Sequence, residues 1–113
     1  MAAFVDVVAG SVGPAGRWVH FGLTSSDVLD TGLALQLRDA CDLLLQALER
    51  LLMVAKRMAL SNRDLVMAGR THGVVAEPTS FGHKVALWAF ELDRDRDRLR
   101  RARETVSVGA ISG

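Results

Sequence analysis

Apolar side chains in the middle of this chain recur at the spacing of an α-helix. From Leu29 to Met58 they fall at steps of three and four residues, which places them on one helical face. The pattern predicts a helix over 26–60, with Ser26 or Asp27 as its cap and a length of about 50 Å. A second apolar flank widens this face, so more than one partner helix is expected against it. That flank consists of Val28, Gly32, Leu35, Leu43, Ala47, Leu52 and Val54.

A second apolar stripe follows further along the chain and keeps close to heptad spacing. It consists of Phe81, Val85, Trp88, Leu92, Leu99, Ala102 and Val106, with the polar Asp95 at a seam position. Pro78 precedes Thr79 and Ser80, either of which suits the start of a helix. The stripe therefore predicts a helix over 79–106, antiparallel to the first.

The remaining segments lack a regular period. Glycines and a proline interrupt the chain between Gly10 and Gly16, so residues 1–24 are expected to be a loop-rich lead-in. Residues 61–78 are expected to connect the two helices. The predicted fold class is all-α, with residues 1–113 forming a single helical segment of long antiparallel helices.

Composition excludes several classes of protein. A chain of 113 residues with 50% apolar residues and a net charge of +1 is about the size of one globular domain. The run from Glu91 to Glu104 holds six arginines but also five acids, a mixture typical of a solvated helix face rather than a nucleic-acid site. The expected ion pairs are Asp93 with Arg96, Asp95 with Arg98, and Asp97 with Arg101.

Cysteine content and hydropathy bear on the compartment. Cys41 is the only cysteine, so no intramolecular disulfide can form. The N-terminus lacks a basic leader region, and no apolar run approaches the ~18 residues that cross a bilayer. These features favour a cytoplasmic protein with no membrane partner.

Two polar islands stand out against the apolar background. The first is HFGLTSSD, from His20 to Asp27, and the second is GRTHGVVAEPTSFG, from Gly69 to Gly82. Each is expected to end where a long helix begins, and helix N-termini favour anions. The hydroxyls and acid of the first island are either a helix cap alone or a cap that also binds a ligand, and both readings stay open.

The second island holds the strongest candidate for chemistry. Arg70, Thr71 and His72 place a cation, a hydroxyl and a titratable imidazole at consecutive positions, a set suited to proton transfer on an anionic substrate. A lone loop histidine is more often inert, which is the competing interpretation. His20 has a similar neighbourhood, whereas His83 is expected to have a surface or packing role. The three histidines lack the spacing of metal ligands, so neither a metal nor a cofactor is expected.

The residues of both islands carry a resemblance to a known family. The segments HFGLTSSDVLDTGLALQLRDA and GRTHGVVAEPTSFGHKVALW resemble the first and second signature regions of the adenylosuccinate lyase branch of the fumarase and aspartase superfamily. The argininosuccinate lyase branch is expected to differ at Ser25 to Asp27. The carboxymuconate cycloisomerase branch usually lacks a histidine at the position of His72.

The resemblance implies a reaction and a set of roles. The reaction is a β-elimination that releases fumarate from adenylosuccinate, giving AMP, and from the succinylcarboxamide intermediate of purine biosynthesis. His72 would be the general acid and His20 would orient the substrate. Hydrogen bonds to substrate oxygens would come from Thr24, Ser25 and Thr71, with Arg70 beside them, while Ser26 and Asp27 would support the loop.

The resemblance also implies an assembly. Such helices form the central bundle of a homotetramer, in which each active site takes its three signature regions from three subunits. The third region, with the serine base, has no counterpart in this sequence, nor has the upstream Arg-His-Asp segment. Val74 and Val75 stand where many relatives have a polar residue. The chain is therefore expected to be an inactive fragment of a longer lyase; the alternative is a non-catalytic helical oligomerisation module.

Overall fold

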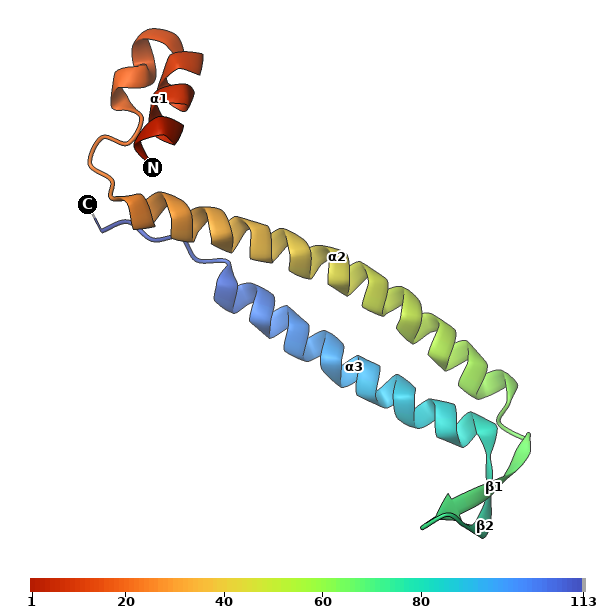
Figure 1. Cartoon of the computed structure of the whole chain (residues 1–113). Helices are drawn as coiled ribbons and strands as arrows, with labels where there is room; N and C mark the ends of the chain where they lie inside the picture. Colours follow the sequence, from red (N-terminus) through yellow and green to blue (C-terminus); the bar gives the residue numbers. More distant parts are fainter. Residues whose placement is uncertain (113) are drawn as a thin grey trace.

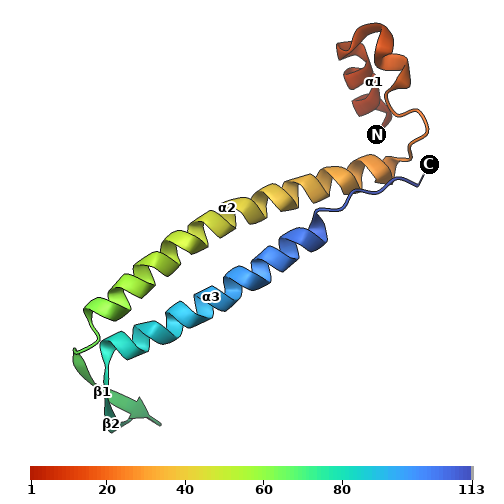
Figure 2. The ribbon, with the colours of Figure 1, turned by 180° about the vertical axis from the view of Figure 1, so that it is seen from behind.

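Two long helices that run antiparallel to each other dominate the molecule (Figure 1). The computed structural model describes residues 1–112. Helix α2 comprises Ser25–Ser61 and helix α3 comprises Phe81–Val106. Seen from behind, the same two helices lie side by side along most of α3, and both curve gently (Figure 2). The fold is therefore mostly helical.

The apolar contact between α2 and α3 is small and lies toward the end of the molecule where α2 stops. Its buried centre consists of Leu52, Ala55, Val85 and Ala89, with Ala59, Phe81 and Leu92 packed against it. These positions repeat at three- and four-residue steps on each helix, which brings them onto facing sides. The alanines allow the two helices to approach closely.

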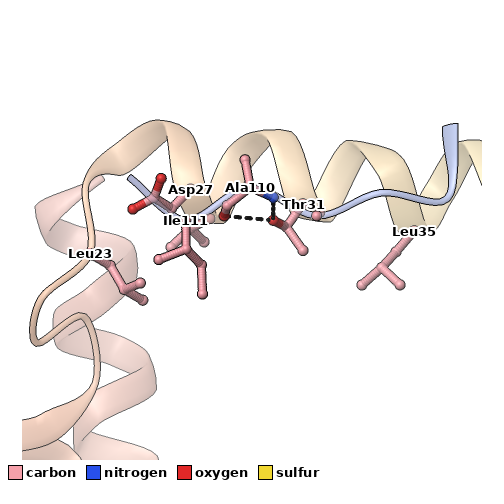
Figure 3. A pocket seen from close by; sticks show the side chains of 9 residues that line it. Leu23, Asp27, Thr31, Leu35, Ala110 and Ile111 are labelled. Carbon is pink, nitrogen blue, oxygen red and sulfur yellow. Dashed lines mark hydrogen bonds between the residues drawn. The ribbon is translucent and has the colours of Figure 1, made fainter. Parts of the chain in front are cut away.

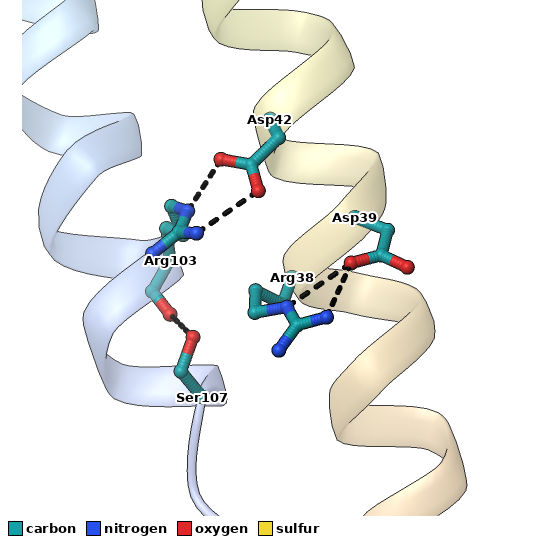
Figure 4. Close-up of polar contacts among 5 residues, drawn as sticks. All are labelled: Arg38, Asp39, Asp42, Arg103 and Ser107. Atoms are coloured by element: carbon teal, nitrogen blue, oxygen red, sulfur yellow. Dashed lines mark hydrogen bonds and ion pairs between the residues drawn. The ribbon is translucent and has the colours of Figure 1, made fainter.

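Ion pairs hold the other half of the helix pair together (Figure 4). Arg103 of α3 donates two hydrogen bonds to the carboxylate of Asp42 of α2, one of them 2.9 Å long between Nη2 and Oδ2. The hydrogen bonds from Arg103 hold the pKa of Asp42 below its ordinary value. A second pair joins the helices where Nη2 of Arg100 in α3 lies 3.3 Å from Oε1 of Glu49 in α2. These two pairs join α3 to α2 along this half of the contact.

Pairs within α3 follow the expected pattern with one exception. Arg96 contacts Asp93 at 2.9 Å and Arg98 contacts Asp95, as predicted. The predicted partner of Asp97 was wrong. Asp97 lies 3.7 Å from Arg100, which is three residues further along the helix, and 3.8 Å from Arg96.

The expectation of a loop-rich lead-in over 1–24 was wrong for most of that range. Helix α1 comprises Ala2–Ser11, and the 3-10 helix η1 comprises Gly13–Trp18. Pro14 lies at the start of η1, where its fixed φ is compatible with a helix. Gly16 packs against α1, since a Cβ there would lie 2.2 Å from the carbonyl oxygen of Ala9. Gly13 thus begins the second of two short helices, and Gly16 allows it to pack closely against the first.

A β-hairpin lies between the two long helices, so the all-α prediction is corrected, and the connection expected over 61–78 contains two paired strands. Strand β1 comprises Val66–Thr71 and β2 comprises Val74–Ser80, paired antiparallel with a bulge between Ala68 and Arg70. The bulge includes Gly69, where a Cβ would lie 2.4 Å from the carbonyl oxygen of Glu77. The β-branched residues Thr71, Val74 and Val75 near the tip favour strands.

The molecule is elongated and leaves much apolar surface open. It measures 74 × 26 × 20 Å, and large hydrophobic side chains along α2, such as Leu29, Leu43 and Leu60, are more than half exposed. Among residues 1–112, no helix is both long and apolar enough to cross a membrane.

Candidate functional site

The first island forms the N-terminus of α2. Thr24 is the N-cap residue, with extended backbone angles, and Asp27 completes a capping box with it. The backbone N–H of Thr24 donates to Oδ2 of Asp27 at 2.9 Å. The N-cap residue thus lies two or three residues before the predicted Ser26 or Asp27, although Asp27 does help to cap the helix as the N3 residue of the capping box. Ser25 and Ser26 occupy the first helical turn with exposed side chains.

This arrangement leaves donors available at a helix N-terminus. Ser25 and Ser26 bear hydroxyls beside backbone N–H groups that have no partner within the helix. The helix dipole adds a partial positive charge at the same place. The first island therefore has the local chemistry of an anion-binding turn.

His20 lies in a turn that precedes this helix. Its φ of 74° is in the left-handed region, which few non-glycine residues adopt. The side chain is half-buried, and within residues 1–112 its Nε2 atom is buried with no hydrogen-bond partner. The neighbouring rings of Trp18 and Phe21 pack edge to face at 5.3 Å. This ring nitrogen therefore lacks the hydrogen bond that a buried polar atom ordinarily makes.

The second island forms the tip of the β-hairpin. Thr71 pairs with Val74, so His72 and Gly73 are the two central residues of a tight turn. Their φ angles are 50° and 77°, the combination of a type I′ turn, which suits the twist of the paired strands. Arg70, Thr71 and His72 are all exposed. The turn thus presents the imidazole of His72 outward.

The expected helix N-terminus beside His72 is absent from this place. Strand β2 separates His72 from α3 by seven residues, roughly 20 Å of extended chain. The helix dipole is felt only within about one turn, so it does not act on His72. At the start of α3, the Oγ of Ser80 accepts a hydrogen bond of 3.0 Å from the backbone N–H of His83. Ser80 is therefore the cap, and His83 is exposed in the first turn, in line with its expected surface role.

The two islands lie far apart in space, at opposite ends of α2. Helix α2 runs from the first island toward the hairpin, and its 37 residues span about 55 Å (Figure 1). Within one chain, His20, Thr24 and Ser25 are grouped at one end, and Arg70, Thr71 and His72 at the other. Val74 and Val75 pair with Thr71 and Arg70 across the hairpin and are exposed. A single chain therefore carries two separate parts of a site.

The segment after α3 returns to the first island. It lies along the N-terminal half of α2 and borders a groove of about 690 Å³ that includes Leu23, Asp27 and Leu35 (Figure 3). The backbone N–H of Ala110 donates to Oγ1 of Thr31 at 3.1 Å. Sequence reasoning missed this contact because its partners are 79 residues apart and no local pattern connects them. The groove lining is mostly apolar.

Side chains that could bind a metal ion do not cluster in the described part of the chain. Across residues 1–112 there is no group of three or more His, Cys, Asp or Glu side chains that could hold a metal ion. The free thiol of Cys41 is half-buried within α2.

Comparisons with known proteins place these features in a wider context. A family model described as a lyase matches residues 2–113. The adenylosuccinate lyase of Aquifex aeolicus is 50% identical over 111 residues, which cover 98% of this chain and 25% of that protein. The chain spans about a quarter of the length of the curated relatives it matches.

Solved structures show the same arrangement of helices and hairpin. A fumarate lyase from Mesorhizobium sp. BNC1 matches with a TM-score of 0.93 and 36% identity, over 99% of this chain and 26% of that one. The 3-carboxy-cis,cis-muconate lactonizing enzyme of Pseudomonas putida matches with a TM-score of 0.88 and 40% identity, over 99% and 25%. Each match covers both islands.

Proposed function

Because this chain belongs to the lyase family, we propose that it is the part of an adenylosuccinate lyase that carries two of the regions surrounding the substrate. The proposal rests on 50% identity to an adenylosuccinate lyase over a stretch that includes both islands. The reaction would eliminate fumarate from adenylosuccinate, leaving AMP, and from the succinylcarboxamide intermediate of purine biosynthesis. In that reaction a carbon–nitrogen bond breaks, so the departing nitrogen needs a proton.

His72 is the residue that we assign to supply that proton. Its imidazole is exposed at the hairpin tip, so a substrate can approach it. An imidazole can both donate and accept a proton, which suits a group that gives and regains a proton in each cycle. Thr71 and Arg70 precede it and would bind substrate oxygens. The exposed Val74 and Val75 leave the other strand at the tip without polar groups.

The first island would bind an anionic part of the substrate. Thr24 and Ser25 place hydroxyls at the N-terminus of α2, and His20 offers a buried ring nitrogen without a partner among residues 1–112. Carboxylate and phosphate groups are stabilised at such a helix end. We assign substrate orientation to His20 and a supporting role to Ser26 and Asp27.

The separation of the islands supports an oligomeric enzyme. One α2 helix stands between them, so one chain would contribute its islands to two different active sites. We propose a homotetramer in which the long helices form a central bundle, and the exposed leucines of α2 supply apolar surface for it. The serine base would come from a third region that this sequence does not contain, so the chain alone is expected to be inactive.

A direct test measures fumarate release from adenylosuccinate by the longer polypeptide that contains this sequence. His72→Asn is the sharpest variant, because asparagine also favours the type I′ turn and so preserves the hairpin. We expect kcat to fall about 10²- to 10⁴-fold, the usual contribution of a general acid. His83→Asn, at an exposed histidine of the same chain, is the matched control and should stay within about threefold of the parent.

Two results would contradict the proposal. Turnover of adenylosuccinate that survives His72→Asn unchanged would remove the general acid assignment. Absence of turnover in the parent itself would leave the chain as a helical association module, or favour the muconate chemistry named for the Pseudomonas putida protein. Assay of the parent with 3-carboxy-cis,cis-muconate separates these last two.

A further inference from the structure

Asp27 is a buried carboxylate that joins two segments far apart in the sequence. Only 4% of its surface is exposed. Oδ2 accepts a hydrogen bond of 2.9 Å from the backbone N–H of Thr24. Oδ1 accepts two more from Ser112, one of 2.9 Å from the backbone N–H and one of 3.0 Å from Oγ. The two carboxylate oxygens therefore face different parts of the chain.

The segment that contains Ser112 is held at a second point. Oγ1 of Thr31 accepts a hydrogen bond of 3.1 Å from the N–H of Ala110 and lies 3.4 Å from the carbonyl oxygen of the same residue (Figure 3). Gly109 lies close to Thr31 as well, since a Cβ there would be 3.3 Å from Cγ2. Thr31 and Asp27 are four residues apart, so they present adjacent side chains on one helical face. The segment is thus aligned along the first turns of α2.

Capping alone does not account for this arrangement. A capping box uses one oxygen of the acid for the N-cap N–H and does not require a partner for the other. Here the second oxygen is bound as well, and the carboxylate is buried. Hydrogen bonds to an ionised acceptor are short and strong, so they fix the position of both donors. The first turn of α2 is therefore tied to the segment after α3.

We propose that Asp27 is a positioning residue for the substrate-binding turn, acting through Thr24 and Ser25. The inference rests on the proposed lyase function and assigns to Asp27 a role beyond the helix cap. The Ser112 contact holds one carboxylate oxygen, and the other then holds the backbone of Thr24. The hydroxyls of Thr24 and Ser25 are thereby kept in one orientation toward the anionic group of the substrate.

The chemistry of the bridge gives a sharp variant. An asparagine at this position has one acceptor oxygen and one NH₂ donor, so it can accept from Thr24 or from Ser112 but not from both sides. In the longer polypeptide that contains this sequence, Asp27→Asn should lower kcat/KM for adenylosuccinate about 10- to 100-fold, the scale of a small misplacement of binding groups. We expect most of the loss as a rise in KM, because the affected groups bind the substrate.

Asp42→Asn is the matched control. Asp42 also joins α2 to α3, through its hydrogen bonds with Arg103, but it lies about four turns of helix away from the first island. The same chemical change there should lower the melting temperature and leave kcat/KM within about threefold of the parent. A purely structural role for Asp27 would make the two variants alike.

A double-mutant cycle with Ser25→Ala adds a second readout. If Asp27 acts through the first island, the effect of Asp27→Asn on kcat/KM should shrink in the Ser25→Ala background. Simple multiplication of the two effects, or an unchanged kcat/KM in folded Asp27→Asn protein, would overturn the inference. Should Asp27→Asn fail to fold, Ser112→Ala removes only the Oγ bond and should still raise KM severalfold; no change there would also overturn it. An inactive parent would instead contradict the proposed function.

Discussion

The two polar islands look alike in the sequence but differ in structure. The first is a helix N-terminus, with a capping box and a buried carboxylate that ties it to a distant segment. The second is the exposed tip of a hairpin, held by a two-residue turn and the pairing of two strands. The first island thus fixes its hydroxyls at a helix end, whereas the second presents the exposed imidazole of His72 at the end of two strands. Under the roles that we propose, the helix N-terminus would bind the substrate and the hairpin tip would transfer the proton.

The largest expected effect concerns the attachment of the hairpin to the helices. Gly82 lies where α3 starts against the end of α2, and a Cβ there would be 2.4 Å from the carbonyl oxygen of Ala59 and 2.6 Å from the backbone N of Arg63. Gly82→Ala should lower the free energy of unfolding by about 1–3 kcal/mol, as overpacking does. Urea unfolding followed by circular dichroism measures it.

Gly32→Ala is the control for that prediction. Gly32 lies within α2 with no heavy atom within 4 Å of an added Cβ. Alanine is the better helix former, so this variant should gain up to about 1 kcal/mol. Equal effects of the two substitutions would mean that the hairpin junction is not closely packed.

The next effect concerns the turn of the second island. His72 has a φ of 50°, and a β-branched residue is strained there. His72→Val should weaken the hairpin by about 1–2 kcal/mol, whereas His72→Asn should leave it intact. Hydrogen exchange of the backbone amides in β1 and β2 measures the difference. Equal protection in both variants would show that the turn does not set the hairpin.

The two helix caps provide a smaller effect that distinguishes the islands. Thr24→Ala and Ser80→Ala each remove a capping side chain, and each should cost about 1 kcal/mol of stability. In the longer polypeptide, only Thr24→Ala should also raise KM for adenylosuccinate. Matching changes in KM for both variants would place the substrate-binding role outside the first island.

The smallest expected effect is a pH dependence of the helix pair. The pKa of Asp42 is held below its ordinary value by Arg103, so its stabilising contribution is present above the unfolded pKa of about 3.9. The contribution is lost as the pH falls through the lower, folded pKa. The difference in melting temperature between the parent chain and Asp42→Asn should therefore shrink below about pH 4. A constant difference from pH 7 to pH 3 would contradict this.

Periodicity predicted the mostly helical character of the chain, because long stripes such as that from Leu29 to Met58 admit few alternatives. It missed the hairpin. Each strand is too short for its period to stand out. His72 and Gly73 were interpreted as part of a loop with catalytic residues, although a glycine after a residue that tolerates positive φ is a hairpin signal. Helix α1 was missed because its apolar run is too short for a period to show.

The candidate site was predictable only in part. The residues of both islands could be named from their chemistry, but the placement of His72 beside a helix end was wrong because an unrecognised strand intervenes. The bond between Asp27 and Ser112 had no local signal, since 85 residues separate its ends. The roles assigned to the site residues stay predictions.

The elongated shape has a consequence for any measurement of molecular mass. The radius of gyration is 24.3 Å, whereas a compact chain of this length would have about 13 Å. By the same scaling, a compact protein with this radius would contain roughly five times as many residues. A single extended chain would therefore leave a gel-filtration column earlier than a compact chain of the same mass, and its apparent mass would be too high. Only a shape-independent mass, from light scattering or sedimentation equilibrium, can distinguish one chain from four.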